Sequence, residues 1–90
     1  MWTLPRESKE YVGPITVKLG GVEVDTFEIS VSVAGERPET WEDPVDYEGA
    51  PHRLTGPHDS DLPVGLHHVW ARVTDDPQLP VIFAGSIHVT

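Results

Sequence analysis

The fold is decided by the last stretch of the chain, Leu62-Pro-Val-Gly-Leu-His-His-Val-Trp-Ala-Arg-Val-Thr-Asp-Asp-Pro-Gln-Leu-Pro-Val-Ile-Phe-Ala-Gly-Ser-Ile-His-Val-Thr90. Apolar residues alternate in both halves at the period of two that is typical of a half-buried β-strand. Between the halves, Asp75-Asp76-Pro77 has the composition of a turn. The pattern predicts two long antiparallel strands. Their inner face is expected to carry His67, Val69, Ala71, Val73, Val81, Phe83, Gly85, Ile87 and Val89.

A second hairpin is expected near the N-terminus, where Gly20-Gly21 separates two alternating runs. Two adjacent glycines suit a two-residue turn because both can adopt positive φ. The inward phase then slips by one residue before Phe27, so Asp25-Thr26 is expected to mark a bulge or a change of sheet. We expect the core to include Ile15, Val17, Phe27, Ile29 and Val31. The side chains expected to be exposed or at an interface are Lys18, Glu28, Ser30 and Arg72.

The middle of the chain is acidic and rich in proline. Residues 36–48 hold six carboxylates and two prolines, which indicates a long connection with one short strand near Trp41. Residues 49–65 hold three Pro and three Gly, which indicates loop with a short strand around 52–54. About seven short strands without helical periodicity predict an all-β fold, an antiparallel sandwich.

Composition limits the classes of partner. Fifteen Asp and Glu against six Lys and Arg give a net charge of −9, which argues against nucleic acid and favours a basic protein surface. The 90 residues suit one domain, and there is no cysteine for a disulfide. Neither a signal peptide nor a membrane span is visible, so a soluble protein made in the cytoplasm is expected. Residues 1–10 are expected to be a frayed terminus or an arm whose Trp2 and Leu4 anchor on a partner.

Catalytic and metal-binding chemistry is not predicted. His67 and His68 are neighbours on a strand and point to opposite faces, so they cannot share an ion. His68 is expected opposite Ser86 with His88 diagonal to it, but no carboxylate completes a metal site. Asp59-Ser60-Asp61 is either a loose calcium loop or a solvated acidic loop. No serine lies in a nucleophile elbow, no phosphate-binding loop precedes a helix, and the carboxylates lie in exposed segments.

The outer face of the predicted C-terminal hairpin is the candidate binding surface. A Trp beside an Arg and histidines is typical of an interface centre. Within the same chain, the arm or the acidic connection could instead fold over Trp70. The candidate interface residues are Trp70, Arg72, His68, Ile82, His88, Trp2 and Leu4.

The quoted stretch resembles small proteins encoded in the structural gene clusters of tailed phages of actinobacteria. Members typically carry Pro-x-Gly-x-Tyr-x-Val-Trp-Val-Arg-Val-Thr-Asp-x-Pro and then Ala-Gly before a short final strand. Upstream, Gly21-Val-Glu-Val-Asp25 matches their Gly-Val-x-Val-Asp step, and Trp41 and Tyr47 match two aromatic residues after a Pro. The chain departs from this pattern at His67, where Tyr is usual, and in its acidic middle.

The resemblance implies an immunoglobulin-like sandwich over residues 11–90 and a virion component assembled in the host cytoplasm. It implies a capsid decoration or minor capsid protein that docks on the major capsid protein, or alternatively a head-to-tail connector or tail subunit. A homo-oligomer is compatible with either role, and no cofactor is implied. A carbohydrate-binding module, in which Trp70 or Trp41 stacks on a sugar ring, is the alternative from a different class. His67 occupies the inward position where such sandwiches often carry the corner Tyr. It is expected to form a hydrogen bond with a loop carbonyl, as that Tyr does.

Overall fold

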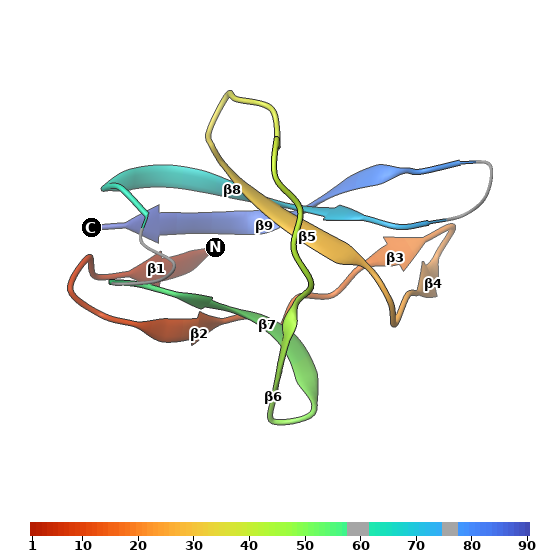
Figure 1. Cartoon of the computed structure of the whole chain (residues 1–90), viewed down its shortest axis with the longest axis horizontal. Coiled ribbons are helices and arrows are strands. Elements are labelled where there is room, and N and C mark those ends of the chain that lie inside the picture. The colour runs from red at the N-terminus through yellow and green to blue at the C-terminus, as the bar shows by residue number, and fades with distance from the viewer. Residues whose placement is uncertain (58–61, 75–77) are drawn as a thin grey trace.

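The computed structural model describes residues 1–57, 62–74 and 78–90. Within them the chain forms nine β-strands in three sheets and no helix (Figure 1). The all-β prediction is therefore confirmed. The strands are β1 (Trp2–Leu4), β2 (Glu10–Val12), β3 (Lys18–Leu19), β4 (Val22–Glu23), β5 (Glu28–Val33), β6 (Val45–Tyr47), β7 (Ala50–Thr55), β8 (Gly65–Arg72) and β9 (Val81–Val89).

The largest sheet has the strand order β1-β9-β8-β5. The antiparallel β8-β9 pair is the predicted C-terminal hairpin, and its expected turn at Asp75-Asp76-Pro77 lies outside the described residues. β5 pairs antiparallel with β8, whereas β1 pairs parallel with β9. In Figure 1 β8 and β9 run side by side along the long axis, and β5 crosses beside them.

A β-bulge in β9 changes the predicted phase of half that strand. Val69 lies opposite Gly85, but the next residue, Trp70, lies opposite Phe83, so Ala84 is the extra residue. One inserted residue turns every side chain before it to the other face. Phe83 is consequently 53% exposed, and its predicted burial is wrong. The same reason corrects Val81, which is exposed, and Ile82 and Ala84, which pack against the core instead of facing outward.

The N-terminal strand belongs to this sheet. Leu4 is 3% exposed, and Trp2 packs against the core. The Trp2 ring lies over Gly85, where an added Cβ would come within 2.6 Å of it. The prediction that Trp2 and Leu4 are offered to a partner is therefore wrong, because both face the core of their own chain.

The second layer contains the sheet β2-β7-β6 and the separate hairpin β3-β4. The predicted turn at Gly20-Gly21 is confirmed, with φ of 59° and 82°. The expected change of sheet at Asp25-Thr26 is also confirmed, since β4 and β5 belong to different sheets. β7 is longer than the strand expected at 52–54. Near Trp41 there is only an isolated bridge from Glu42 to Ile29, and β6 follows.

The core lies between these layers. Ten of the fourteen residues predicted for the inner face or the core are buried as expected; Val31 and Gly85 are half-buried, and Val81 and Phe83 are exposed. Ser30 is 1% exposed, so its predicted exposure is wrong. It lies opposite Trp70, and the bridge at Ile29 brings the connection around Glu42 against β5. The buried apolar residues are Leu4, Val12, Ile15, Val17, Phe27, Ile29, Val69, Ala71, Val73, Ile87 and Val89.

Candidate functional site

The outer face of the large sheet carries most of the predicted interface residues. Residues directly opposite each other in a sheet share a face, and the register pairs Trp70 with Phe83 and with Ser30. His68 lies opposite Ser86, as predicted. We call the Trp70 face the outward side chains of His68, Trp70, Arg72, Val81 and Phe83.

Three rings at the centre of the Trp70 face meet edge to face. The centroids of Trp70 and Phe83 are 5.6 Å apart at 72°, and those of His68 and Phe83 are 5.2 Å apart at 84°. His68 and Trp70 are 6.2 Å apart at 74°. Aromatic pairs favour this T-shaped geometry. The rings therefore hold one another in a fixed arrangement while much of Phe83 stays exposed.

Trp70 is fixed by hydrogen bonds as well as by ring contacts. Its Nε1–H donates to Ser32 Oγ at 3.0 Å, and that hydroxyl donates to the carbonyl of Glu36 at 3.1 Å. The polar atom of the indole is thus satisfied inside the chain. The rest of the ring offers apolar surface only, which a partner can cover without leaving an unpaired N–H.

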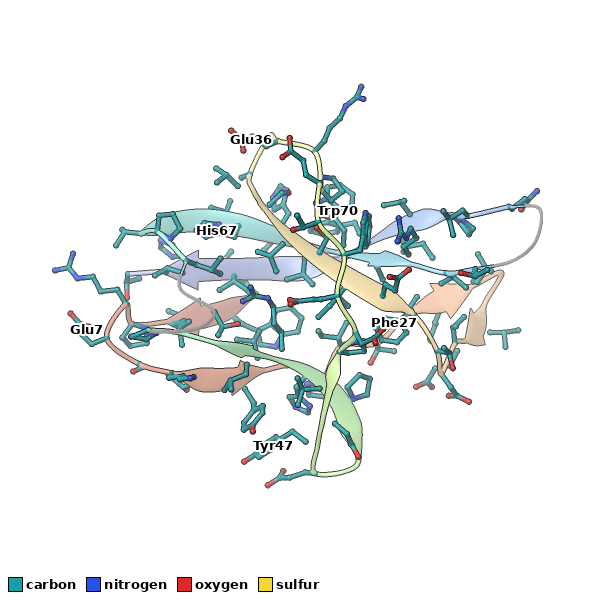
Figure 2. All side chains as sticks on the ribbon, viewed as in Figure 1. Glu7, Phe27, Glu36, Tyr47, His67 and Trp70 are labelled. Carbon is teal, nitrogen blue, oxygen red and sulfur yellow. The ribbon has the colours of Figure 1, made fainter. Side chains whose placement is uncertain are left out.

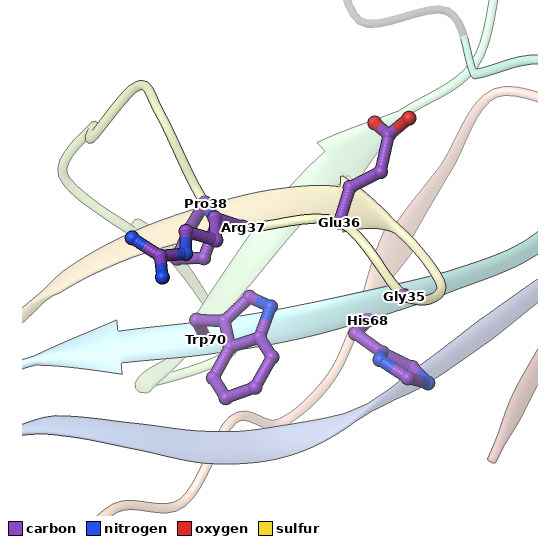
Figure 3. Close-up of a pocket in the computed structure, with 6 residues that line it drawn as sticks. All are labelled: Gly35, Glu36, Arg37, Pro38, His68 and Trp70. Atoms are coloured by element: carbon purple, nitrogen blue, oxygen red, sulfur yellow. The ribbon is translucent and has the colours of Figure 1, made fainter.

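The connection after β5 borders Trp70 but leaves a hollow beside it. Gly35, Glu36, Arg37 and Pro38 line this hollow together with His68 and Trp70, and its volume is about 380 Å³. Figure 3 shows Pro38 and Arg37 to one side of the indole, with His68 farther along the strand that carries Trp70. Of the two expected covers within the chain, the acidic connection is therefore the one beside Trp70, and the N-terminal strand is not.

Arg72 is committed to partners in its own chain. Its guanidinium donates to Glu28 Oε1 at 2.8 Å from Nη2 and at 3.2 Å from Nε. Its Cζ lies 4.5 Å from the centroid of the Trp41 ring, within the range of a cation–π contact. Arg72 is thus predicted correctly as part of this face, and its charge is already paired.

The remaining predicted residues are divided between the surface and the interior. His88 is exposed and opposite Leu66, on the same face as His68, whereas Ile82 turns inward at the bulge. The sequence reasoning missed Phe83 because it did not predict the bulge. The only signal was Gly85, a residue that commonly marks such irregularities inside a strand.

The described residues contain no arrangement suited to a metal site. No group of three or more His, Asp or Glu residues among them could hold a metal ion, and Asp59-Ser60-Asp61 lies outside them. His67 is buried, and its Nε2–H donates to the Pro63 carbonyl at 2.7 Å, which confirms the predicted loop contact. No helix in the described part of the chain is long and apolar enough to cross a membrane.

Comparison of the chain with family models, curated proteins and solved structures found no match.

Proposed function

We propose that the chain is a non-enzymatic virion protein that docks through the Trp70 face on the head shell, as a decoration or minor capsid protein. The observation that carries this proposal is Phe83, 53% exposed yet held edge-on by Trp70 and His68 on a sheet face that the core does not use. An outward face of an antiparallel sheet is ordinarily polar. Clustered exposed apolar groups on such a face mark an interaction site.

The anatomy of the face suits protein adhesion. Trp is among the residues most enriched at energetic centres of interfaces, and here its ring is fixed before any partner arrives. Exposed residues of several kinds surround the rings, including Val81, Glu36 and His88. A rigid aromatic centre with a mixed rim is the usual composition of a protein–protein interface.

The strand order supports an immunoglobulin-like sandwich. Without the β3-β4 hairpin, seven strands remain, in the orders β1-β9-β8-β5 and β2-β7-β6. In immunoglobulin-like domains strands C, F and G share one sheet, and B, E and D share the other. We assign β5, β8 and β9 to strands C, F and G, and β2, β7 and β6 to strands B, E and D. The His67 contact with Pro63, near the start of β8, corresponds to the tyrosine corner near the start of strand F.

The virion assignment comes from the resemblance of the C-terminal motifs to proteins of phage structural gene clusters. The test is attachment of the purified protein to empty heads of the phage that carries this chain. Phe83→Ala is expected to weaken attachment by about 2 kcal/mol or more, the scale of an interface hot spot. Val22→Ala is the matched control, because Val22 is also exposed but lies on the β3-β4 hairpin. Equal attachment of both variants would refute docking through the Trp70 face.

The hollow beside Trp70 favours one other candidate, a carbohydrate-binding module. It places the polar side chains of Glu36, Arg37 and His68 next to an aromatic ring. Two results together would favour this candidate over the proposed function. The parent would be retained on immobilised polysaccharide while Trp70→Ala is not, and the parent would not attach to heads.

The copy number per particle separates the virion roles. Many copies would indicate a decoration protein, and a few copies would indicate a connector or tail subunit.

A further inference from the structure

A second aromatic cluster lies on the other sheet, far from Trp70. The rings of Tyr11 in β2 and Tyr47 in β6 stack with centroids 4.1 Å apart and planes within 9°. His52 in β7 meets both edge-on, 5.2 Å from Tyr47 and 6.5 Å from Tyr11. Figure 2 shows Tyr47 and Trp70 on separate parts of the molecule. We call Tyr11, Tyr47 and His52 the tyrosine cluster.

The tyrosine cluster faces away from the core. Val12 is buried, so its neighbour Tyr11 points outward on the same strand. The register places Tyr11 opposite Leu54, and Val45 opposite His52, on this outer face. Tyr11, Tyr47 and Val45 are 41%, 39% and 43% exposed. Stacking of the two rings covers one face of each, and part of the remaining surface meets solvent.

The floor of the cluster is packed and fixed. His52 is buried, and its Nδ1–H donates to the Ala50 carbonyl at 2.9 Å. Its ring fills the space over Gly13, where an added Cβ would lie only 2.7 Å from it. Because the rings are held before binding, a partner loses little side-chain entropy in meeting them.

A carboxylate lies next to the tyrosine cluster. Glu48 follows Tyr47 in the turn between β6 and β7; it is exposed and forms no ion pair within the described residues. Glu10 and Asp46 lie opposite Thr55 and Pro51, on the other face of the sheet from the tyrosines. Arg53, the cation of β7, has its own partners, since its guanidinium donates to Glu42 at 3.0 Å and to Thr55 at 2.8 Å. The surface therefore combines exposed aromatic rings with the unpaired carboxylate of Glu48.

We propose that the tyrosine cluster is a second docking surface, which receives an arginine or lysine side chain from a basic segment of a partner protein. The cation would lie on an exposed tyrosine surface, with its charge paired by Glu48 and attracted by the net charge of −9 on the chain. The chain already contains this arrangement at Arg72, which lies over Trp41 and pairs with Glu28. A second copy of the chain is a poor occupant, because each copy carries a net charge of −9.

This surface shares no residue with the Trp70 face, so the proposal goes beyond the proposed function and stands independently of it. With both surfaces occupied, one domain joins two partner surfaces and acts as a cross-link between them. Loss of one surface leaves the other intact, which makes the two proposals separable by experiment.

The test is binding of a labelled arginine-rich peptide to the full chain, measured by fluorescence anisotropy at low salt. Tyr47→Ala is expected to weaken binding about fivefold, since an exposed cation–π contact contributes up to about 1 kcal/mol. Phe83→Ala is expected to leave the affinity unchanged. Glu48→Gln is expected to weaken binding more than Glu23→Gln, a charge-matched control on the β3-β4 hairpin that leaves the ring packing alone.

Three results would overturn the proposal. Equal losses in Glu48→Gln and Glu23→Gln would show general attraction to an acidic protein rather than a site. Unchanged affinity in a folded Tyr47→Ala variant would show that the rings do not take part. Self-association of the parent in sedimentation, abolished by Tyr47→Ala, would identify a second copy as the occupant.

Discussion

The Phe83→Ala substitution tests whether Phe83 is an exposed docking side chain or a core side chain. Truncating a fully buried Phe costs about 3–5 kcal/mol of unfolding free energy. Phe83 is 53% exposed, so about half of the burial contribution of such a ring is present to be lost. This share includes its edge contacts with Trp70 and His68, because a truncation cost contains every contact that the ring makes. We expect a total cost of about 1.5–2.5 kcal/mol.

The assay is urea unfolding of the parent and two variants, with free energies taken from linear extrapolation. Ile87→Ala is the internal reference, because Ile87 lies on the same strand beyond the bulge and is fully buried. It is expected to cost about 2–5 kcal/mol, as truncation of a buried Ile usually does. The same Phe83→Ala protein is then used in the attachment experiment.

The result that would refute the reasoning is a Phe83→Ala cost equal to or larger than that of Ile87→Ala. Such a cost would place Phe83 in the core, as the uninterrupted alternation of the sequence suggests. The bulge at Ala84 and the composition of the Trp70 face would both then be wrong.

Three further substitutions test other features. Gly85→Ala is expected to destabilise by about 1–3 kcal/mol, because its φ of 155° and the Trp2 ring leave no room for a Cβ; thermal melting measures this, and Trp2→Ala should recover part of the loss. Failure of that rescue in the double variant would contradict the contact. His67→Phe is expected to cost about 1–3 kcal/mol in urea unfolding, because it leaves the Pro63 carbonyl unpaired; an unchanged midpoint would show the bond to be dispensable. Ser30→Ala is expected to melt at or above the parent temperature, because the buried Ser30 hydroxyl has no partner among the described residues. A clear drop would reveal an unseen partner.

The features that sequence predicts correctly here depend on local chemistry. Gly20-Gly21 forms the hairpin because two adjacent residues can take positive φ. His67 finds the Pro63 carbonyl four residues away, within reach of its own loop. The phase of β8 is readable because apolar and polar residues alternate clearly through Val69 and Ala71.

The bulge in β9 could not be predicted for a physical reason. Ile82 and Phe83 are adjacent and both apolar, so hydrophobicity does not decide which of them faces the core. Tertiary packing decides it, through the register of β9 against β8. The contact of Trp41 with Arg72 could not be predicted either, because it joins a connection to a strand that is distant in sequence. The sequence thus placed His68, Trp70 and Arg72 on one outward face, as the register has them, while the most exposed ring of that face was missed.

The parallel pairing of β1 with β9 has a mechanical consequence. Trp2 lies beside Ile87, and Leu4 lies beside Val89, with both strands running in the same direction. Tension that pulls the start of β1 away from the end of β9 acts along the strands and not across them. The backbone hydrogen bonds of the seam, including Thr90 N–H to the Leu4 carbonyl and Arg6 N–H to the Thr90 carbonyl, are then loaded together instead of one after another. A domain closed in this way resists stretching between its two ends more strongly than one closed by an antiparallel terminal pair that can unzip.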